Sequence, residues 1–385
     1  MDILEYTDDH SRFRKRLRTF LEKEVIPFVD QWEKEGIVPK DVWKKMGLAG
    51  FLCMDVSPKY GGLAGDFLYS VIVCEELVRT DHNGLIANLH SDVVVPYINS
   101  YGSEEVKQKY LPGCVSGDII TALAMTEPDA GSDLAGMRTT AVEDGEEVVI
   151  SGSKIFTSCG IIADLVVLAA IDPDVKNPYD AMSLYLVESG TPGFERGRKL
   201  EKMGYHSQDT AELFFSKCRI PRKNRLGEKG TGFYMLMKNL QQERLITAIG
   251  AVAKAEIILE RTLDYCKATV SSGKPLSKSQ VTQFALVEMA TEVKMGRTFV
   301  DKLIVEHIQG ENIIIETSMA KYWTTEMVKR VADRCLDLFG NFGILEKYRI
   351  ARAWRDVRAM SIYAGTNEIM KEIAAKFMGL KEFVG

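Results

Sequence analysis

Hydrophobic positions recur at helical spacing through the first third of the chain. Apolar residues three or four apart form the buried face of an α-helix, and they follow this spacing in three stretches: residues 10–34, 40–51 and 67–80. The pattern predicts an N-terminal α-helical domain over residues 1–120.

The pattern of residue types along the chain changes between residues 121 and 230. Short runs rich in β-branched and aromatic residues alternate there with Gly, Pro, Asp and Asn, which is typical of strands and turns. The clearest runs are residues 146–158, 164–172, 183–189 and 211–220. They predict a middle β-domain, a barrel or a sandwich, over residues 121–230.

Helical periodicity returns over residues 231–385. Four long stretches with few helix breakers are predicted, near residues 233–268, 277–309, 313–339 and 350–377. Long helices with short connections favour a four-helix bundle. The predicted fold class is therefore α+β and multidomain: helical domain, β-domain, bundle.

Composition narrows the class of protein. Of 385 residues, 46% are hydrophobic and 27% charged, and the net charge is -5, as in ordinary globular proteins rather than nucleic-acid binders. No apolar run reaches the ~18 residues of a membrane-spanning helix. The seven cysteines form no CxxC pair, and the acidic start "MDILEYTDDH" has no signal pattern. Together these features predict a cytoplasmic protein without membrane insertion.

Most common catalytic signatures are absent from the sequence. There is no GxGxxG after a strand, no P-loop, no HExxH and no GxSxG. The five histidines lack metal-ligand spacing, so no metal site is predicted. What remains is a set of turns rich in Gly, Ser and Thr, and one acid in an unexpected place.

That acid is Glu243, in the predicted helix 233–268. It lies seven residues after Leu236 and three after Leu240, and seven before Gly250. These offsets place it on the apolar face of the helix. Two interpretations are open: a structural carboxylate paired with Arg244 or another helix, or a carboxylate directed at a substrate.

Five motifs carry a resemblance that covers essentially the whole chain. Together they resemble the acyl-CoA dehydrogenase family, and its long-chain and isovaleryl-type subgroup in particular. The motifs are "TEPDAGSD" (126–133), "GSKIFTSCG" (152–160), "QDTAELFF" (208–215), "LGEKGTGF" (226–233) and "YAGTNEIM" (363–370). The resemblance implies an FAD-dependent enzyme that converts an acyl-CoA thioester to the trans-2-enoyl-CoA.

The resemblance also assigns the base. Many family members carry a Glu directly after the Tyr of the last motif, where this chain has Ala364. In the long-chain and isovaleryl subgroup the base comes from the bundle helix as "ERL", and Glu243 occupies that position. The resemblance therefore implies that Glu243 removes the α-proton and that the backbone N–H of Ala364 helps to hold the thioester oxygen.

Further site residues follow from the same resemblance. The implied cofactor contacts are Met125, Thr126, Phe156, Ser158, Ser271, Thr366 and Glu368. The implied substrate contacts are Ser132, Arg244, Tyr363 and Gly365. For each of these residues the alternative is ordinary turn or cap chemistry, which Ser, Thr and Gly also favour.

Two segments depart from the family pattern. Residues 269–273 read Thr-Val-Ser-Ser-Gly, without the Arg and Phe that reach the flavin diphosphate of a neighbouring subunit. Residues 337–341 read Asp-Leu-Phe-Gly-Asn, which adds a negative charge near that cofactor. Losing a charge-assisted phosphate contact predicts weaker FAD retention.

The segment from Thr80 to Glu105 is expected to line the acyl pocket. It contains no Lys or Arg, which disfavours a dicarboxylic acyl group, and its apolar residues favour an apolar chain: Leu85, Leu89, Val93 and Val94.

Three functions are compared. The first is an acyl-CoA dehydrogenase, expected as a homotetramer of fatty acid metabolism that passes electrons to an electron-transfer flavoprotein. The alternatives are a relative acting on a carrier-bound acyl group, for which the basic run 222–225 would serve as well as for CoA, and a non-catalytic relative.

Overall fold

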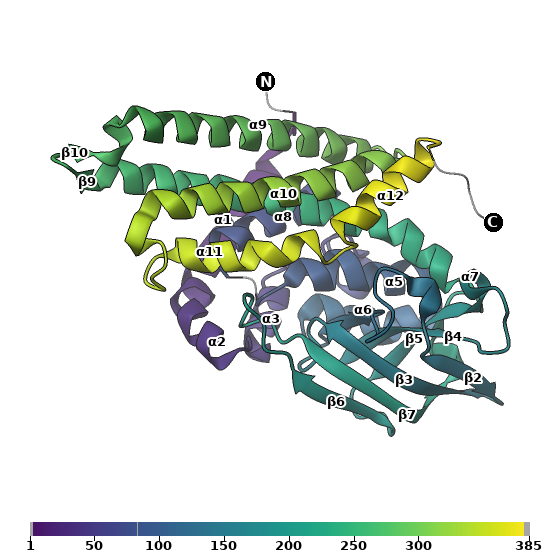
Figure 1. Ribbon diagram of the computed structural model, residues 1–385. Helices are drawn as coiled ribbons and strands as arrows, with labels where there is room; N and C mark the ends of the chain where they lie inside the picture. The colour runs from purple at the N-terminus through teal and green to yellow at the C-terminus, as the bar shows by residue number, and fades with distance from the viewer. Residues whose placement is uncertain (1–2, 83, 381–385) are drawn as a thin grey trace.

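The computed structural model describes residues 3–82 and 84–380 (Figure 1). Its N-terminal part is helical, and side chains cap three of these helices: Thr7, Asp66 and Ser103. The helices are α1 (Asp8–Glu24), α2 (Val29–Glu35), α3 (Lys40–Leu48), α4 (Phe67–Arg79), α5 (Val95–Tyr101) and α6 (Glu104–Ser116). A π-helical segment, η3 (Leu89–Val94), runs directly into α5.

The middle part is a sheet in the strand order β6-β7-β3-β2-β4-β5-β8, with β1 beside β4. The strands are β1 (Thr121–Ala124), β2 (Thr140–Asp144), β3 (Glu147–Thr157), β4 (Leu165–Ile171), β5 (Met182–Glu188), β6 (Phe194–Lys199), β7 (Ala211–Pro221) and β8 (Arg225–Leu226). Its two halves join where β2 pairs with β4, at Thr140 and Ile171. The strand pairs thus connect into one sheet, which forms the predicted middle β-domain. The short helix α7 (Pro178–Ala181) precedes β5.

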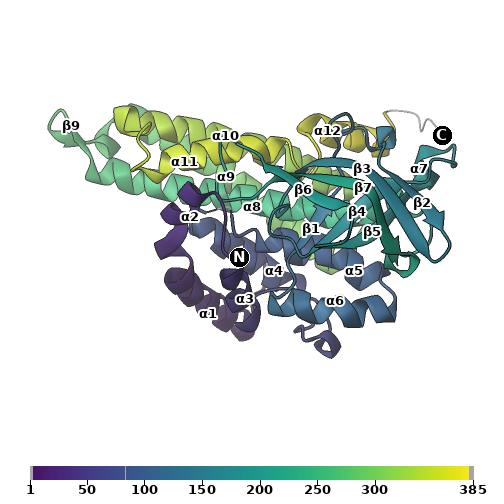
Figure 2. The ribbon, with the colours of Figure 1, turned by 90° about the horizontal axis from the view of Figure 1, so that it is seen from below.

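The C-terminal part is the predicted helical bundle. It contains α8 (Gly232–Ala268), α9 (Gln280–Ile308), α10 (Ile314–Phe339), α11 (Arg349–Val357) and α12 (Asn367–Phe377). A hairpin of β9 (Val270–Ser271) and β10 (Lys274–Pro275) connects α8 to α9. Figures 1 and 2 show the long helices spanning the molecule, with the sheet at one end and this hairpin at the other.

The last predicted helix, 350–377, is wrong as one continuous element. Residues 358–366 interrupt it, and the interruption contains Ala364 and Gly365 in the left-handed region, at φ 55° and 87°. Helix α11 ends at Val357 and is followed by a 3-10 turn, η8 (Arg358–Ser361). The left-handed residues that follow cannot belong to a right-handed helix, and the Thr366 side chain then caps α12. The interruption falls within the "YAGTNEIM" motif.

Two hydrophobic cores hold the parts together. One is shared by the N-terminal helices, the sheet and the first turns of α8. The other lies inside the bundle and includes Leu68 and Val71 of α4. An ion-pair network adds to this contact: Arg297 of α9 pairs with Glu75 of α4 and Glu256 of α8, at 2.9 and 2.7 Å. Within the described ranges no helix is long and apolar enough to cross a membrane.

Candidate active site

Helix α8 directs the Glu243 carboxylate into the protein. The Oε2 atom is buried and has no hydrogen-bond partner. Burial raises the pKa of Glu243 to about 7, although the positive charges of Arg244 and Lys321 act in the opposite direction. A buried acid poised near neutral pH can accept a proton from a substrate.

Lys321 of α10, which the sequence did not single out, acts electrostatically on Glu243 and bonds to the interrupted segment. Its fully buried ammonium donates to the Gly365 carbonyl at 2.6 Å and to the Asn367 side chain at 3.2 Å. Burial, and then the nearby charge of Arg244, lower the pKa of Lys321 to about 7. The feature of the sequence that could have indicated Lys321 is that it is the single lysine in the stretch "TSMAKYWTT" of a predicted inward-facing helix.

The segment Ile362–Thr366 has a constrained backbone. Ala364 adopts a left-handed conformation that a residue with a Cβ rarely takes, and such conformations cluster at functional sites. On one side of it, the Tyr363 ring lies 6.5 Å from the Tyr205 ring, between centroids. On the other, Thr366 Oγ1 accepts the Ile369 N–H at 3.3 Å.

A second group of predicted residues meets at one end of β3. The carbonyl of Met125 accepts from the Lys154 ammonium, and that of Thr126 from the Ile155 N–H, each at 2.9 Å. These bonds place both residues beside the end of β3, which carries Phe156 and is followed by Ser158.

Phe156 is unusual for a strand residue. The register of β3 against β7 shifts between Lys154 and Thr157, and Phe156 has φ 58° and an exposure of 63%. The next hydroxyl, Thr157 Oγ1, is buried without a partner, and Ser158 Oγ accepts from Gln208 at 2.9 Å. An exposed aromatic ring beside an unpaired buried hydroxyl suits a flat, polar-edged cofactor such as a flavin. Gln208, also missed, stood at the start of the quoted "QDTAELFF" motif.

The other predicted site residues lie in other parts of the structure or make no contact that indicates a function. Ser271 is exposed in the β9–β10 hairpin, at the opposite end of the bundle from the sheet (Figure 1). Ser132 and Glu368 are exposed, at a loop and in the first turn of α12. Arg244 is buried, with its Nε unpaired.

The segment predicted to line the acyl pocket is mostly core. Leu85, Val93 and Val94 are buried among the N-terminal helices, and Leu89 is partly buried. Both of its histidines are structural: His90 lies 2.8 Å from Thr121 Oγ1, and His82 lies 3.2 Å from Ser207 Oγ.

The basic run 222–225 is engaged within the chain. Arg222, Lys223 and Arg225 form ion pairs with Glu146, Glu105 and Glu143, at 2.9, 2.5 and 2.6 Å. The Asn224 side chain is buried and donates to a backbone carbonyl.

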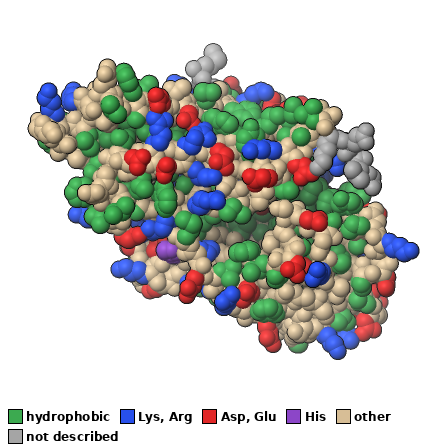
Figure 3. Space-filling view, in the orientation of Figure 1, with side chains coloured by type: hydrophobic (Ala, Val, Ile, Leu, Met, Phe, Trp, Pro, Cys, Tyr) green, Lys and Arg blue, Asp and Glu red, His purple; other side chains and the backbone are tan. Residues whose placement is uncertain are grey.

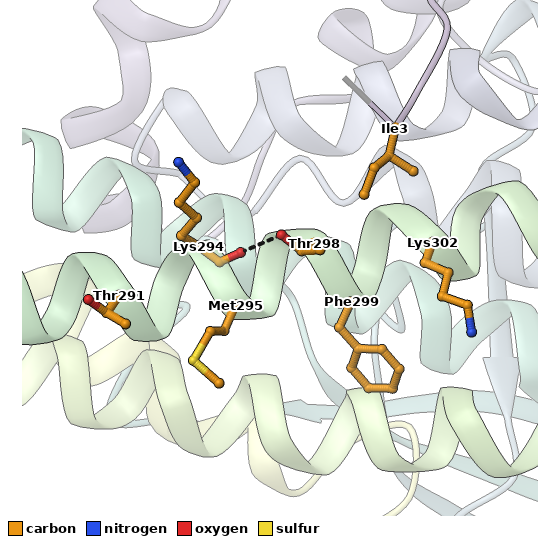
Figure 4. A pocket seen from close by; sticks show the side chains of 7 residues that line it. All are labelled: Ile3, Thr291, Lys294, Met295, Thr298, Phe299 and Lys302. Atoms are coloured by element: carbon orange, nitrogen blue, oxygen red, sulfur yellow. Dashed lines mark hydrogen bonds between the residues drawn. The ribbon is translucent and has the colours of Figure 1, made fainter. Parts of the chain in front are cut away.

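A cavity of about 710 Å³ lies elsewhere, on the outer face of α9 (Figure 4). Its lining residues are Ile3, Thr291, Lys294, Met295, Thr298, Phe299 and Lys302, and none of them is a predicted site residue. In the space-filling view, charged side chains of both signs are interspersed over the bundle, and the surface is hollowed between the bundle and the sheet (Figure 3).

Comparison with known proteins gives the same three-part division. Family models match in order: "Acyl-CoA dehydrogenase, N-terminal domain" over residues 7–118, "middle domain" over 122–218 and "C-terminal domain" over 230–379. The chain is 42% identical to the mitochondrial long-chain specific acyl-CoA dehydrogenase of Mus musculus over 96% of this chain and 86% of that protein. It is 35% identical to an acyl-CoA dehydrogenase of Bacillus subtilis, over 97% and 98%.

A solved structure agrees at the level of the fold. The crystal structure of an acyl-CoA dehydrogenase from Geobacillus kaustophilus is 53% identical in sequence and superposes with a TM-score of 0.96. The match covers 97% of this chain and 98% of that one.

Proposed function

Because this chain belongs to the acyl-CoA dehydrogenase family, we propose that Glu243 is the base that removes the proton α to the thioester carbonyl. The protein is an FAD-dependent oxidoreductase that dehydrogenates acyl-CoA. The comparisons do not favour the carrier-bound substrate or the non-catalytic relative.

One observation carries the assignment of the base. Glu243 Oε2 is buried with no hydrogen-bond partner, and the pKa of this carboxyl is raised to about 7. A structural carboxylate in the same position would be expected to hold a close donor, since an unpaired buried polar group is costly. A base must instead stay free to take a proton, and its pKa should lie near the working pH.

The interrupted segment supplies the second half of the chemistry. As the α-proton leaves, negative charge develops on the thioester oxygen, and fixed N–H donors stabilise such charge. We propose the Ala364 N–H as this donor, because the backbone beside it is held in place. Lys321 donates to the carbonyl of Gly365, and the Thr366 side chain caps α12. Tyr363 and Gly365, which flank Ala364, would line the same space.

The flavin would lie against the end of β3. Phe156, with 63% exposure, and the unpaired Thr157 hydroxyl fit its ring, and Met125, Thr126 and Ser158 lie beside them. When bound there, the flavin would supply the acceptor for the hydride that leaves the β-carbon of the substrate. Thr366 and Glu368 would contact the cofactor near α12, and Ser271 would reach one bound by a neighbouring subunit.

For the substrate we propose an acyl-CoA with an apolar chain, its CoA part passing Ser132. The segment 80–105 contains no Lys or Arg, so a second carboxylate would lack a cation there. Arg244, next to the base, is buried with its Nε unpaired, and we place it on the substrate side of the site.

We propose further that the enzyme is a homotetramer of fatty acid metabolism that passes its electrons to an electron-transfer flavoprotein. The groove on α9 and the apolar residues exposed along this helix, among them Val281, Phe284 and Val287, support burial against another copy. A cytoplasmic location is supported by the cysteines, all seven of which are free and buried. The tetramer is tested by light scattering of the purified holoenzyme.

The test of the base is Glu243→Gln in the flavin-loaded enzyme. Anaerobic flavin reduction by acyl-CoA is expected to fall by ~100- to 10,000-fold, the usual loss on removing a general base. Glu260→Gln, an exposed site on the same helix whose side chain is 58% exposed, is the matched control. Reduction by Glu243→Gln at the control's rate would remove Glu243 from the mechanism.

A further inference from the structure

The residue before the base bridges three elements. Gln242 of α8 donates from Nε2 to the backbone carbonyl of Asp92 in η3, at 2.7 Å. Its Oε1 lies 3.2 Å from Nε2 of His307, in the last turn of α9. Since a carbonyl only accepts, the first bond fixes the orientation of the amide, and the second then requires a proton on His307 Nε2.

The Asp92 carbonyl needs this partner for a reason visible in the sequence. In a regular helix the carbonyl of residue 92 would accept from the N–H of residue 96. Residue 96 is Pro, which has no N–H. The π-helical segment η3 ends just before this proline, and such segments are frequent at functional sites. The pairing of η3 joins residues five apart, as in the bond from the Val95 N–H to the His90 carbonyl, and it cannot continue at Pro96. Gln242 therefore donates to a carbonyl at the junction of η3 and α5.

Both ends of this bridge are anchored. The Asp92 side chain accepts from Ser70 Oγ at 2.5 Å and from Asn88 Nδ2 at 2.7 Å, which ties η3 to α4. The His307 ring packs edge-on against Phe67, with centroids 4.5 Å apart. Burial lowers the pKa of His307, so the ring is neutral and carries the single proton that the bond to Gln242 uses.

We propose that Gln242 is a positioning residue for the base: its two hydrogen bonds fix α8 against η3 and α9 immediately before Glu243. The inference rests on the proposed role of Glu243. A displacement of about 1 Å at a reacting group can cost ~100-fold in rate. Gln242→Met keeps the length of the side chain and removes both bonds, so it is expected to slow proton removal without blocking substrate binding.

A second substitution distinguishes two roles of Gln242: positioning α8, or only hydrogen bonding to the buried carbonyl of Asp92. His307→Phe removes the bond to α9 and leaves the bond from Gln242 to the Asp92 carbonyl in place. If Gln242 positions α8, this variant should also reduce flavin more slowly than wild type. If Gln242 only satisfies the carbonyl, the rate of flavin reduction should stay at that of wild type.

The experiment uses flavin-loaded enzyme and the acyl-CoA that reduces the wild-type flavin fastest in a series from butyryl- to palmitoyl-CoA. For Gln242→Met the limiting rate of anaerobic reduction should fall ~10- to 100-fold, as expected for a displaced base, with the half-saturating acyl-CoA concentration within about twofold of wild type. Gln241→Met, the neighbouring residue, is the matched control and should reduce at the wild-type rate. Urea unfolding of every variant gives the second readout.

Three outcomes would overturn a specific claim. Wild-type reduction by Gln242→Met, with Glu243→Gln inactive, refutes the positioning role alone. Wild-type reduction by His307→Phe, with Gln242→Met slow, shows that Gln242 only satisfies a carbonyl, and also refutes it. Full activity of Glu243→Gln refutes the proposed base, whatever Gln242→Met does.

Discussion

Two buried carboxylates, Glu127 beside the sheet and Glu243 in the bundle, have opposite surroundings. The Glu127 carboxylate accepts from the Lys154 ammonium at 2.8 Å, and from the backbone N–H groups of Arg138 and Thr139 at 2.7 and 2.9 Å. Oε2 of Glu243 has no hydrogen-bond partner, and its nearest cations, Arg244 and Lys321, act at longer range.

The two pKa shifts follow from this difference. Burial disfavours the charged form of both groups, but for Glu127 the hydrogen bonds from Lys154 and Thr139 outweigh it, and the pKa is lowered. For Glu243 burial prevails, and the pKa rises to about 7. Burial alone therefore does not mark a catalytic acid. A buried carboxylate paired with a cation, as Glu127 is with Lys154, stabilises the fold, whereas one with an oxygen that lacks a donor is available for chemistry.

The largest effect that would test this contrast is on folding. Glu127→Gln leaves the fully buried Lys154 ammonium without its counter-charge, and breaking a buried pair in this way costs ~3–5 kcal/mol of unfolding free energy. Urea unfolding measures this loss, and Glu127→Gln/Lys154→Met should recover part of it. Glu243→Gln should cost little or nothing. An equal loss for both single variants would contradict the comparison.

The pH dependence of stability should also differ in sign. The folded pKa of Glu243 is raised from 4.5 to about 7, so its stability cost is absent below pH 4.5, grows as pH rises, and is complete above pH 7. Glu243→Gln should therefore gain stability relative to wild type across this window. Glu127 has a lowered folded pKa, so its contribution is present above the ordinary pKa and is lost as the pH falls through the folded value.

The next prediction moves the base. If Glu243 and Ala364 face the same substrate carbon, Glu243→Gly/Ala364→Glu should reduce flavin faster than Glu243→Gly alone. Recovery should be incomplete, because a displaced base meets the proton at a poorer angle and about 1 Å of error can cost ~100-fold. The measurement is anaerobic reduction across acyl-CoA chain lengths at matched flavin occupancy. A double variant no faster than the single one on every chain would show that the two positions do not converge.

The sequence was informative where one physical signal dominates. Periodicity placed α8, α9 and α10 within a few residues of their observed ends, because long amphipathic helices repeat the same pattern many times. It also placed Glu243 on the inward face of α8. Four strands of the sheet were missed, β1, β2, β6 and β8, since runs of two to six residues carry little periodic signal.

The parts that failed depend on contacts between distant segments. The stretch 350–377 has helical periodicity, but the left-handed backbone at Ala364 is held by Lys321, which is remote in sequence. The bulge that exposes Phe156 depends on the register of β3 against β7. The bond from Gln242 to the Asp92 carbonyl spans 150 residues, and no local pattern encodes such a partner.

The smallest predicted effect concerns the cofactor at the far end of the bundle. Thr269 ends α8, and its N–H bonds to the carbonyl of Tyr265, whose ring stacks on Phe339 of α10 at 3.9 Å. Asp337 is exposed in the last turn of α10, so an acid lies where the family resemblance places a neighbouring subunit's anionic cofactor. Thr269→Arg should restore a charge-assisted contact to its phosphates.

The gain for Thr269→Arg should be modest, since an exposed ion pair contributes only ~0–1 kcal/mol. It should appear as a higher flavin-to-protein ratio after gel filtration of dilute enzyme at low salt. Thr269→Gln, similar in length to the new side chain but uncharged, is the control. Salt screens exposed charges within about 8–10 Å at ~0.1–0.15 M, so the advantage of Arg over Gln should shrink as salt is added. If the Arg variant retains no more flavin than the Gln variant at any salt concentration, residue 269 does not meet the cofactor's phosphates, and another residue fills that role.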